Sequence, residues 1–166
     1  MGGSIGGVRR LGIMNSDARY LEDLTVGERR ETGDFLLTEE ESVAFAGRYD
    51  PQPMHTDREA AESGPLNGLA ASGWQTTAIV MRLIAHARQF GSTPVLGLGV
   101  DELRWPAPVR PGDIIRAEME IISITPSRSK PGFGVVRVQI TARNQRGEVV
   151  LKMIPNLWVP RKPVPG

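Results

Sequence analysis

The chain has 166 residues, a length that suits one domain built around a single hydrophobic core. Its formal net charge of +1 excludes a general electrostatic attraction to nucleic acid or to a membrane surface. Since the chain has no cysteine, disulfides, thiolate catalysis and cysteine-ligated zinc are excluded as well.

The N-terminal residues differ in composition from the rest of the chain. Residues 1–15 are rich in glycine and lack the long apolar run of a signal peptide. No segment approaches the roughly 20 consecutive apolar residues of a membrane span. We therefore predict a flexible leader over residues 1–19, one domain over residues 20–160, a short tail over residues 161–166, and a cytoplasmic location.

Residues 29–37 are the first candidate strand, and two capping boxes follow it. Residues 38–41 read Thr-Glu-Glu-Glu, which predicts a short helix from about residue 39 to about residue 47. Residues 56–59 read Thr-Asp-Arg-Glu and predict a second helix that starts directly after His55. Two prolines lie between the two helices, so we expect a stiff, non-helical loop there.

The longest predicted helix begins with a third capping pattern at residues 72–75 and continues to about residue 90. Gln75, Arg82, His86 and Gln89 form one narrow polar stripe at helical spacing. Most of the remaining girth is apolar, which is typical of a largely buried helix. Among its apolar side chains, we expect Trp74 and Met81 to be core residues rather than ligand contacts.

Four later segments have the pattern of strands. Residues 115–121 and 136–142 alternate apolar and polar side chains, as antiparallel strands with one buried face do. Residues 95–105 and 149–159 are further strands, and Pro155 indicates an edge strand or a bulge in the last of them. Together with the long helix, these strands predict an α+β fold in which an antiparallel sheet wraps around a helix.

The loop between the first two helices carries the strongest chemical signal. Asp50 and His55 stand five residues apart, and His55 is one of only two histidines in the chain. A carboxylate and an imidazole held together can bind and polarise one water molecule. A purely structural alternative also exists, because Asp before Pro is a common turn residue and His55 could cap the neighbouring helix.

A metal site is a further alternative for this loop. Asp50, His55 and Asp57 offer an oxygen, a nitrogen and an oxygen ligand. One histidine without cysteine is a poor ligand set for zinc, so we predict that no metal is bound. Asp57 is better explained as a carboxylate in the first turn of a helix, where the helix dipole favours it.

The loop resembles the signature of the MaoC-like, (R)-specific enoyl-CoA hydratases, which reads Asp-x-Asn-Pro-aliphatic-His with a small residue six positions after the His. The residues that fit this signature are Asp50, Pro53, Met54, His55 and Ala61. Gln52 stands where Asn is usual, and Tyr49 stands where Gly usually precedes the Asp. Residues 103–113 are similar to the strand, turn and Pro-Gly-Asp segment of the same family, and the resemblance covers about residues 20–159.

The resemblance implies the hot dog fold and the reversible hydration of a trans-2-enoyl-CoA to the (R)-3-hydroxyacyl-CoA. Asp50 and His55 would hold the attacking water, with Asp50 exchanging its proton. The backbone N–H of Gly73 would donate to the thioester oxygen, since the first residues of a helix have free N–H groups. The family usually has His before this Gly; here it is Ser72, which we interpret as a helix cap rather than a substrate contact. No cofactor is required, since coenzyme A is part of the substrate.

Other residues are candidates for substrate binding. Ser72, Gln52 and Trp74 flank the expected site, and Arg128 and Lys130 lie in a loop from which they could reach the phosphates of coenzyme A. Arg104 and Arg110 are weaker candidates for the same phosphates. The expected partners are an acyl-CoA and a second copy of the chain, since an open sheet edge favours a homodimer.

Two other functions stay open on the sequence alone. A hot dog thioesterase would direct a water at the thioester carbonyl instead of the C3 atom. A non-catalytic acyl-CoA-binding protein would explain the departures at Tyr49, Gln52 and Ser72 as lost activity. The presence of both Asp50 and His55 favours the hydratase.

Overall fold

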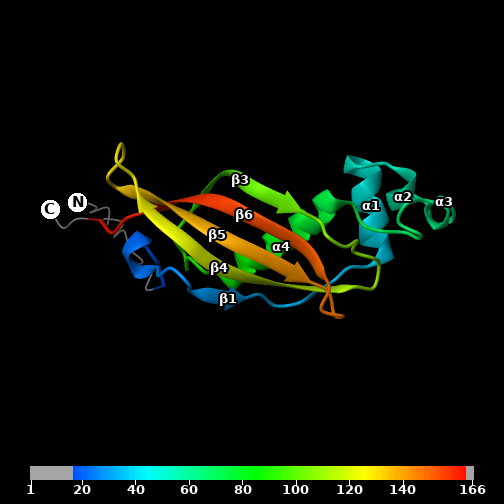
Figure 1. The fold of residues 1–166 in the computed structure, drawn as a ribbon, viewed down its shortest axis with the longest axis horizontal. Coiled ribbons are helices and arrows are strands. Elements are labelled where there is room, and N and C mark those ends of the chain that lie inside the picture. The colour runs from blue at the N-terminus through cyan, green and yellow to red at the C-terminus, as the bar shows by residue number, and fades with distance from the viewer. Residues whose placement is uncertain (1–16, 164–166) are drawn as a thin grey trace, which may run out of the picture.

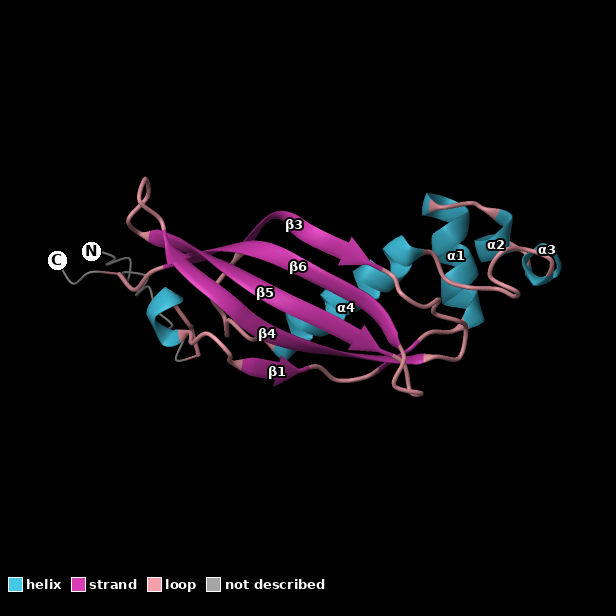
Figure 2. Cartoon of the chain, in the orientation of Figure 1, coloured by secondary structure: helices cyan, strands magenta, loops and turns pink. Residues whose placement is uncertain are grey.

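The computed structural model describes residues 17–163, which form one antiparallel sheet with helices on one face and at one end (Figure 1). The strands are β1 (Arg29–Glu31), β2 (Phe35–Leu36), β3 (Leu96–Arg104), β4 (Ile114–Pro126), β5 (Phe133–Arg143) and β6 (Val149–Pro160). Their order in the sheet is β1-β4-β5-β6-β3, and β2 also pairs with β4. Figure 2 shows that the strands make up a single layer. No helix in the described part of the chain is long and apolar enough to cross a membrane.

One detail of the predicted strands was wrong, and the structure decides between two alternatives for another. The expected strand over residues 29–37 is split into β1 and β2, with residues 32–34 between them. Strand β6 is not an edge strand, because it pairs with β5 on one side and with β3 on the other. Pro155 is paired with Val100 of β3, beside a shift in the register of the β3–β6 pair, so the bulge interpretation is the correct one.

Helix α4 (Gly73–Ala87) packs against one face of the sheet and forms the core with it (Figure 1). Ile79, Val80 and Leu83 are buried against alternate side chains of β4 and β5, whose burial follows the two-residue period of a half-buried strand. Each such side chain contributes about 1.5–3 kcal/mol when it is fully buried. The fold is therefore the predicted sheet wrapped around a long helix.

The apolar girth of α4 is less buried than its sequence indicates. Trp74 is 60% exposed and Met81 is 52% exposed in the single chain, so the prediction that both belong to the core was wrong. An apolar pattern on a helix indicates side chains that avoid water. It does not tell whether they are covered by the core of their own chain or by a second molecule.

Three short helices lie together beyond one end of the sheet: α1 (Glu39–Tyr49), α2 (Pro53–Thr56) and α3 (Arg58–Glu62) (Figure 1). The capping box before α1 is confirmed, because the Thr38 side chain accepts from the Glu41 N–H. The segment around His55 is not the non-helical loop that we expected. Pro53 starts the one-turn helix α2, as proline at a first helical position can, and His55 lies inside it. The cap of α3 is Asp57 and not Thr56: the Asp57 carboxylate accepts from the Ala60 N–H at 3.1 Å.

Contacts among the described residues continue beyond residues 20–160 at both ends. Ala18 forms a β-bridge with Gly91, and Arg19 makes an ion pair with Glu28 at 2.6 Å. At the other end, the backbone N–H of Lys162 donates to a Glu22 carboxylate oxygen at 2.9 Å. Most of the predicted leader (residues 1–16) and the last three residues of the tail lie outside the described residues.

Candidate active site

Asp50 is placed at the end of α1 by the proline that follows it. Its backbone N–H closes the helix on the Ala46 carbonyl oxygen at 2.9 Å. A residue before proline is disfavoured in the helical region, and Asp50 accordingly leaves it, with φ −151° and ψ 68°. The helix therefore ends at Asp50, whose side chain is 18% exposed.

His55 is fixed from the opposite side. It is buried in α2, and its Nδ1 atom lies 2.8 Å from the carbonyl oxygen of Ala70. A carbonyl oxygen can only accept, so Nδ1 carries the hydrogen and the neutral ring presents a lone pair at Nε2. This Nε2 atom faces Asp50 Oδ2 at 3.5 Å. Two acceptors at this separation do not bond to each other when the ring is neutral, but both can accept from one water molecule.

Asp50 accepts two side-chain hydrogen bonds. Ser72 Oγ donates to Oδ2 at 2.6 Å, and Gln52 Nε2 donates to Oδ1 at 2.7 Å. These bonds, the one from Ser72 first, hold the pKa of Asp50 below its ordinary value; burial opposes them, and the proximity of His55 adds a smaller lowering. The carboxylate is therefore ionised at neutral pH and able to accept a proton from a water.

The start of α4 lies beside this carboxylate because Ser72 connects the two. The Ser72 hydroxyl donates to Asp50 and accepts from the Trp74 N–H at 3.3 Å, so it caps the helix as predicted. Gly73 is the first helical residue, and its N–H pairs with no acceptor among residues 17–163. Such an N–H, reinforced by the helix dipole, is suited to bind a negatively charged oxygen.

Gly73 is also required by close packing. A Cβ atom at this position would lie 2.7 Å from Cδ2 of the Trp105 indole, which covers the start of the helix. The indole is held by a hydrogen bond from its Nε1 to Thr77 Oγ1 at 3.1 Å and by an edge-on contact with Trp74, with ring centroids 5.3 Å apart. Sequence reasoning missed the role of Trp105, because nothing in the local pattern links it to Gly73.

The other candidate binding residues are not all near this site. Gln52 contacts Asp50, and Trp74 stands exposed beside Gly73. Arg128 and Lys130 lie in the β4–β5 connection, at the opposite end of the molecule from α1 and α2 (Figure 1). Arg110 donates to the carbonyl oxygens of Leu66 and Leu69 and thereby holds the loop before α4, which explains it without a phosphate.

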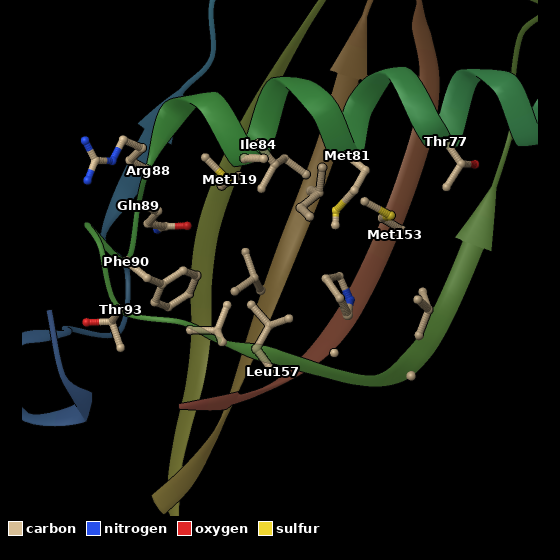
Figure 3. A pocket seen from close by; sticks show the side chains of 18 of the residues that line it. Thr77, Met81, Ile84, Arg88, Gln89, Phe90, Thr93, Met119, Met153 and Leu157 are labelled. Carbon is tan, nitrogen blue, oxygen red and sulfur yellow. The ribbon is translucent and has the colours of Figure 1, made fainter. Parts of the chain in front are cut away.

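An apolar cavity of about 560 Å³ begins one helical turn beyond Gly73, a size within the roughly 300–1,000 Å³ of small-molecule pockets (Figure 3). It lies between α4 and the β3–β6–β5 part of the sheet. Thr77 stands at one end, and its hydroxyl donates to the Gly73 carbonyl oxygen at 3.0 Å. Met81, Ile84 and Leu157 are among its walls. No local sequence pattern indicates this cavity, because its lining residues are of the same kinds that form a hydrophobic core.

No group of three or more His, Cys, Asp and Glu side chains in residues 17–163 has an arrangement suited to a metal ion. Asp57, the third ligand that we considered, bonds to the Ala60 N–H as the cap of α3.

Comparisons with known proteins place this arrangement in a family. The family model described as "MaoC like domain" matches residues 23–144. The crystal structure of a MaoC-like dehydratase from Rhodospirillum rubrum is 43% identical and superposes with a TM-score of 0.80, over 87% of this chain and 99% of that one.

Two curated relatives extend the comparison. The uncharacterized protein YdeM of Bacillus subtilis is 31% identical over 126 residues, which cover 76% of this chain and 88% of that protein. The 3-hydroxyacyl-thioester dehydratase Z of Mycobacterium tuberculosis is 32% identical over 101 residues, 59% of this chain and 67% of that protein.

The chain belongs to the MaoC-like dehydratase family, and its sheet and central helix form the hot dog fold. Both parts of the sequence-based prediction, the family and the fold class, are confirmed.

Proposed function

We propose that the protein catalyses the reversible hydration of a trans-2-enoyl thioester, with coenzyme A as the carrier, to the (R)-3-hydroxyacyl thioester. One observation carries the proposal. Asp50 Oδ2 and His55 Nε2 are two acceptors 3.5 Å apart, beside the free N–H group of Gly73 at the start of α4. The resemblance to a 3-hydroxyacyl-thioester dehydratase supports the same reaction class.

The two acceptors define where the attacking water lies. A water that donates one hydrogen to Asp50 and one to His55 has its lone pairs free to attack the C3 atom of the substrate. As the C3–O bond forms, the π electrons move to the thioester oxygen as an enolate and the water loses a proton to Asp50. Asp50 then returns a proton to C2 on the same face, and C2=C3 has gained the elements of water. The fixed Nδ1–H of His55 keeps its Nε2 directed at the water.

The enolate oxygen needs a donor, and the Gly73 N–H supplies it. Removal of one such donor in other enzymes costs about 2.7–4 kcal/mol of transition-state stabilisation, so this contribution is comparable with that of the acid–base groups. Trp105 packs against the same helix start. In this account Ser72 acts through Asp50, which it orients and keeps ionised, and not by touching the substrate.

We further propose that the protein works as a homodimer. Strand β3 is at the edge of the described sheet, and its side chains Leu96, Leu98 and Val100 are exposed. Trp74 and Met81 of α4 are also exposed and apolar. Antiparallel pairing of two β3 edges would cover these side chains. It would also bring the far end of one subunit toward the helical end of the other, and so bring the β4–β5 loop with Arg128 and Lys130 toward a coenzyme A bound at the partner's site.

The test is the loss of enoyl-thioester absorbance with crotonyl-CoA and with longer and branched enoyl-CoAs. Wild type is expected to hydrate at least one of them, and Asp50→Asn and His55→Ala are expected to lose the activity. His86→Ala and Asp34→Asn, which change exposed residues of the same types, serve as matched controls and should retain it. Release of free thiol in place of hydration would instead support a thioesterase, and binding without any turnover would support an acyl-CoA-binding protein.

A further inference from the structure

The far end of the cavity contains a polar group that the proposed chemistry does not use. The cavity follows α4 from Thr77 past Met81 and Ile84 and ends at Gln89 and Phe90, just beyond the last helical residue (Figure 3). The catalytic groups lie at the opposite end of the helix. A chain that enters beside Gly73 and fills the cavity therefore finishes at Gln89.

The Gln89 side chain is buried without a partner. The residue is 1% exposed, and neither its Oε1 nor its Nε2 forms a hydrogen bond with any group of residues 17–163. Figure 3 shows the amide directed into the cavity. Buried side-chain amides are nearly always hydrogen-bonded, because an unpaired one loses its hydration without compensation. The amide thus indicates a polar group that enters from the cavity side.

The position of Gln89 is fixed by the backbone around it. Its carbonyl oxygen accepts from Nη1 of Arg19 at 2.7 Å, and the next residue, Phe90, is buried in the core. Arg19 is itself held by Glu28 at 2.6 Å. These contacts hold the backbone of Gln89 in place at the end of the cavity.

The surroundings select the kind of group that Gln89 can bind. Arg88 lines the cavity, but its guanidinium points away from it and pairs with Asp17 at 2.6 Å, so no cation among the described lining residues faces this end (Figure 3). Thr93 Oγ1 turns outward to accept from the Arg19 N–H at 2.9 Å. An amide alone offers one acceptor and one donor group, and a hydroxyl matches both, because its hydrogen can bond to Oε1 while its oxygen accepts from Nε2. A carboxylate would match Nε2 but would be repelled by Oε1.

We propose that the preferred substrate carries a hydroxyl group near the distal end of its acyl chain and that Gln89 recognises it. This inference rests on the proposed hydratase function. From Thr77 to Ala87 the helix advances about 15 Å, and an extended chain advances about 3.5 Å for every three bonds. That stretch takes about 13 bonds, and the carbons between Gly73 and Thr77 add about five more, so the hydroxyl belongs on a chain of roughly 14 to 18 carbon atoms.

The experiment compares three 2-enoyl-CoA substrates of equal length, bearing a terminal methyl, a terminal hydroxyl or a terminal carboxylate, over chains of about 8 to about 18 carbons. The measurement is kcat/KM for wild type, for Gln89→Leu, and for Gln139→Leu as a matched control on the exposed face of β5. Wild type and Gln139→Leu should prefer the hydroxyl substrate by about tenfold or more at the matching length, the cost of leaving a buried amide unpaired. In Gln89→Leu that preference should disappear or reverse.

Two results would overturn the proposal. One is equal kcat/KM for the methyl and hydroxyl substrates in wild type, which would leave an ordered water as the partner of Gln89. The other is an unchanged preference in Gln89→Leu. Crotonyl-CoA is too short to reach Gln89, so its hydration by wild type tests the proposed function separately. Should no enoyl-CoA react, the shift of the wild-type melting temperature by hydroxylated against plain saturated acyl-CoA still tests Gln89: a larger shift with the hydroxylated ligand supports recognition, and equal shifts refute it.

Discussion

The hydrogen bond from Ser72 to Asp50 joins the stability of the fold to the chemistry of the site, so Ser72→Ala should perturb both. The substitution removes the cap of α4 and the largest cause of the lowered pKa of Asp50. Loss of a helix cap costs about 1 kcal/mol, and loss of a hydrogen bond to a charged group costs about 1.5–3 kcal/mol. We expect a total of about 2–4 kcal/mol at neutral pH, which corresponds to a fall in melting temperature of about 5–15 °C for a domain of this size.

The pH dependence of this loss has a definite sign. Because the folded-state pKa of Asp50 is below its unfolded value of 3.8, the stabilisation is fully present above pH 3.8 and is lost as the pH falls through the folded pKa. The difference in unfolding free energy between wild type and Ser72→Ala should therefore be largest at neutral pH and shrink toward the cost of the cap alone in acid. The acid limb of kcat/KM should move to higher pH in the variant, since its Asp50 is protonated more easily.

Urea unfolding at several pH values measures the first effect, and the pH profile of hydration measures the second. Ser63→Ala, which removes an exposed hydroxyl that bonds to a carbonyl at the end of α3, is the matched control and should change neither. A stability loss in Ser72→Ala that is the same in acid as at neutral pH, together with an unmoved acid limb, would refute the role assigned to Ser72.

Three other perturbations follow from the same geometry. Asp50→Asn should lower the hydration rate by about 10²–10⁴-fold in a steady-state assay, since the amide cannot take the proton of the water, while circular dichroism stays native. Gly73→Ala should cost about 1–3 kcal/mol in denaturant unfolding, because its Cβ would overlap Trp105, and a second change, Trp105→Ala, should recover part of that overlap cost. Leu98→Lys on the edge of β3 should reduce the sedimentation coefficient to that of a monomer; an unchanged coefficient would place the dimer contact elsewhere.

Local signals explain why much of the fold could be predicted from the sequence. The capping boxes depend on residues three positions apart, and the alternation in β4 and β5 depends on residues two positions apart. The error at His55 arose where two local rules competed. Proline can break a helix or start one, and Pro53 starts α2, so Asp57 rather than Thr56 became the next cap.

The parts of the site that could not be predicted depend on contacts far apart in the chain. Ser72 and Asp50 are 22 positions apart, and their hydrogen bond exists only because the end of α1 meets the start of α4. Gln89 belongs to a polar stripe in the sequence, yet its side chain is buried. The helix has ended before this residue, and Arg19, 70 positions earlier in the chain, donates to its carbonyl oxygen. The prediction for Trp74 was wrong in the opposite sense, because this side chain was expected to be buried and is exposed. An apolar side chain on a helix does not tell whether its own chain or a second molecule covers it.

In the proposed mechanism, Asp50 and His55 direct one water to the C3 atom of an enoyl thioester. The most direct measurement is chiral analysis of the product that wild type forms from crotonyl-CoA in deuterated water, beside Asp50→Asn. We expect (R)-3-hydroxybutyryl-CoA with one deuterium at C2, added to the same face as the oxygen, and formation of that product about 10²–10⁴-fold more slowly by the variant. Free coenzyme A with unchanged crotonate, or the (S)-product, would contradict it.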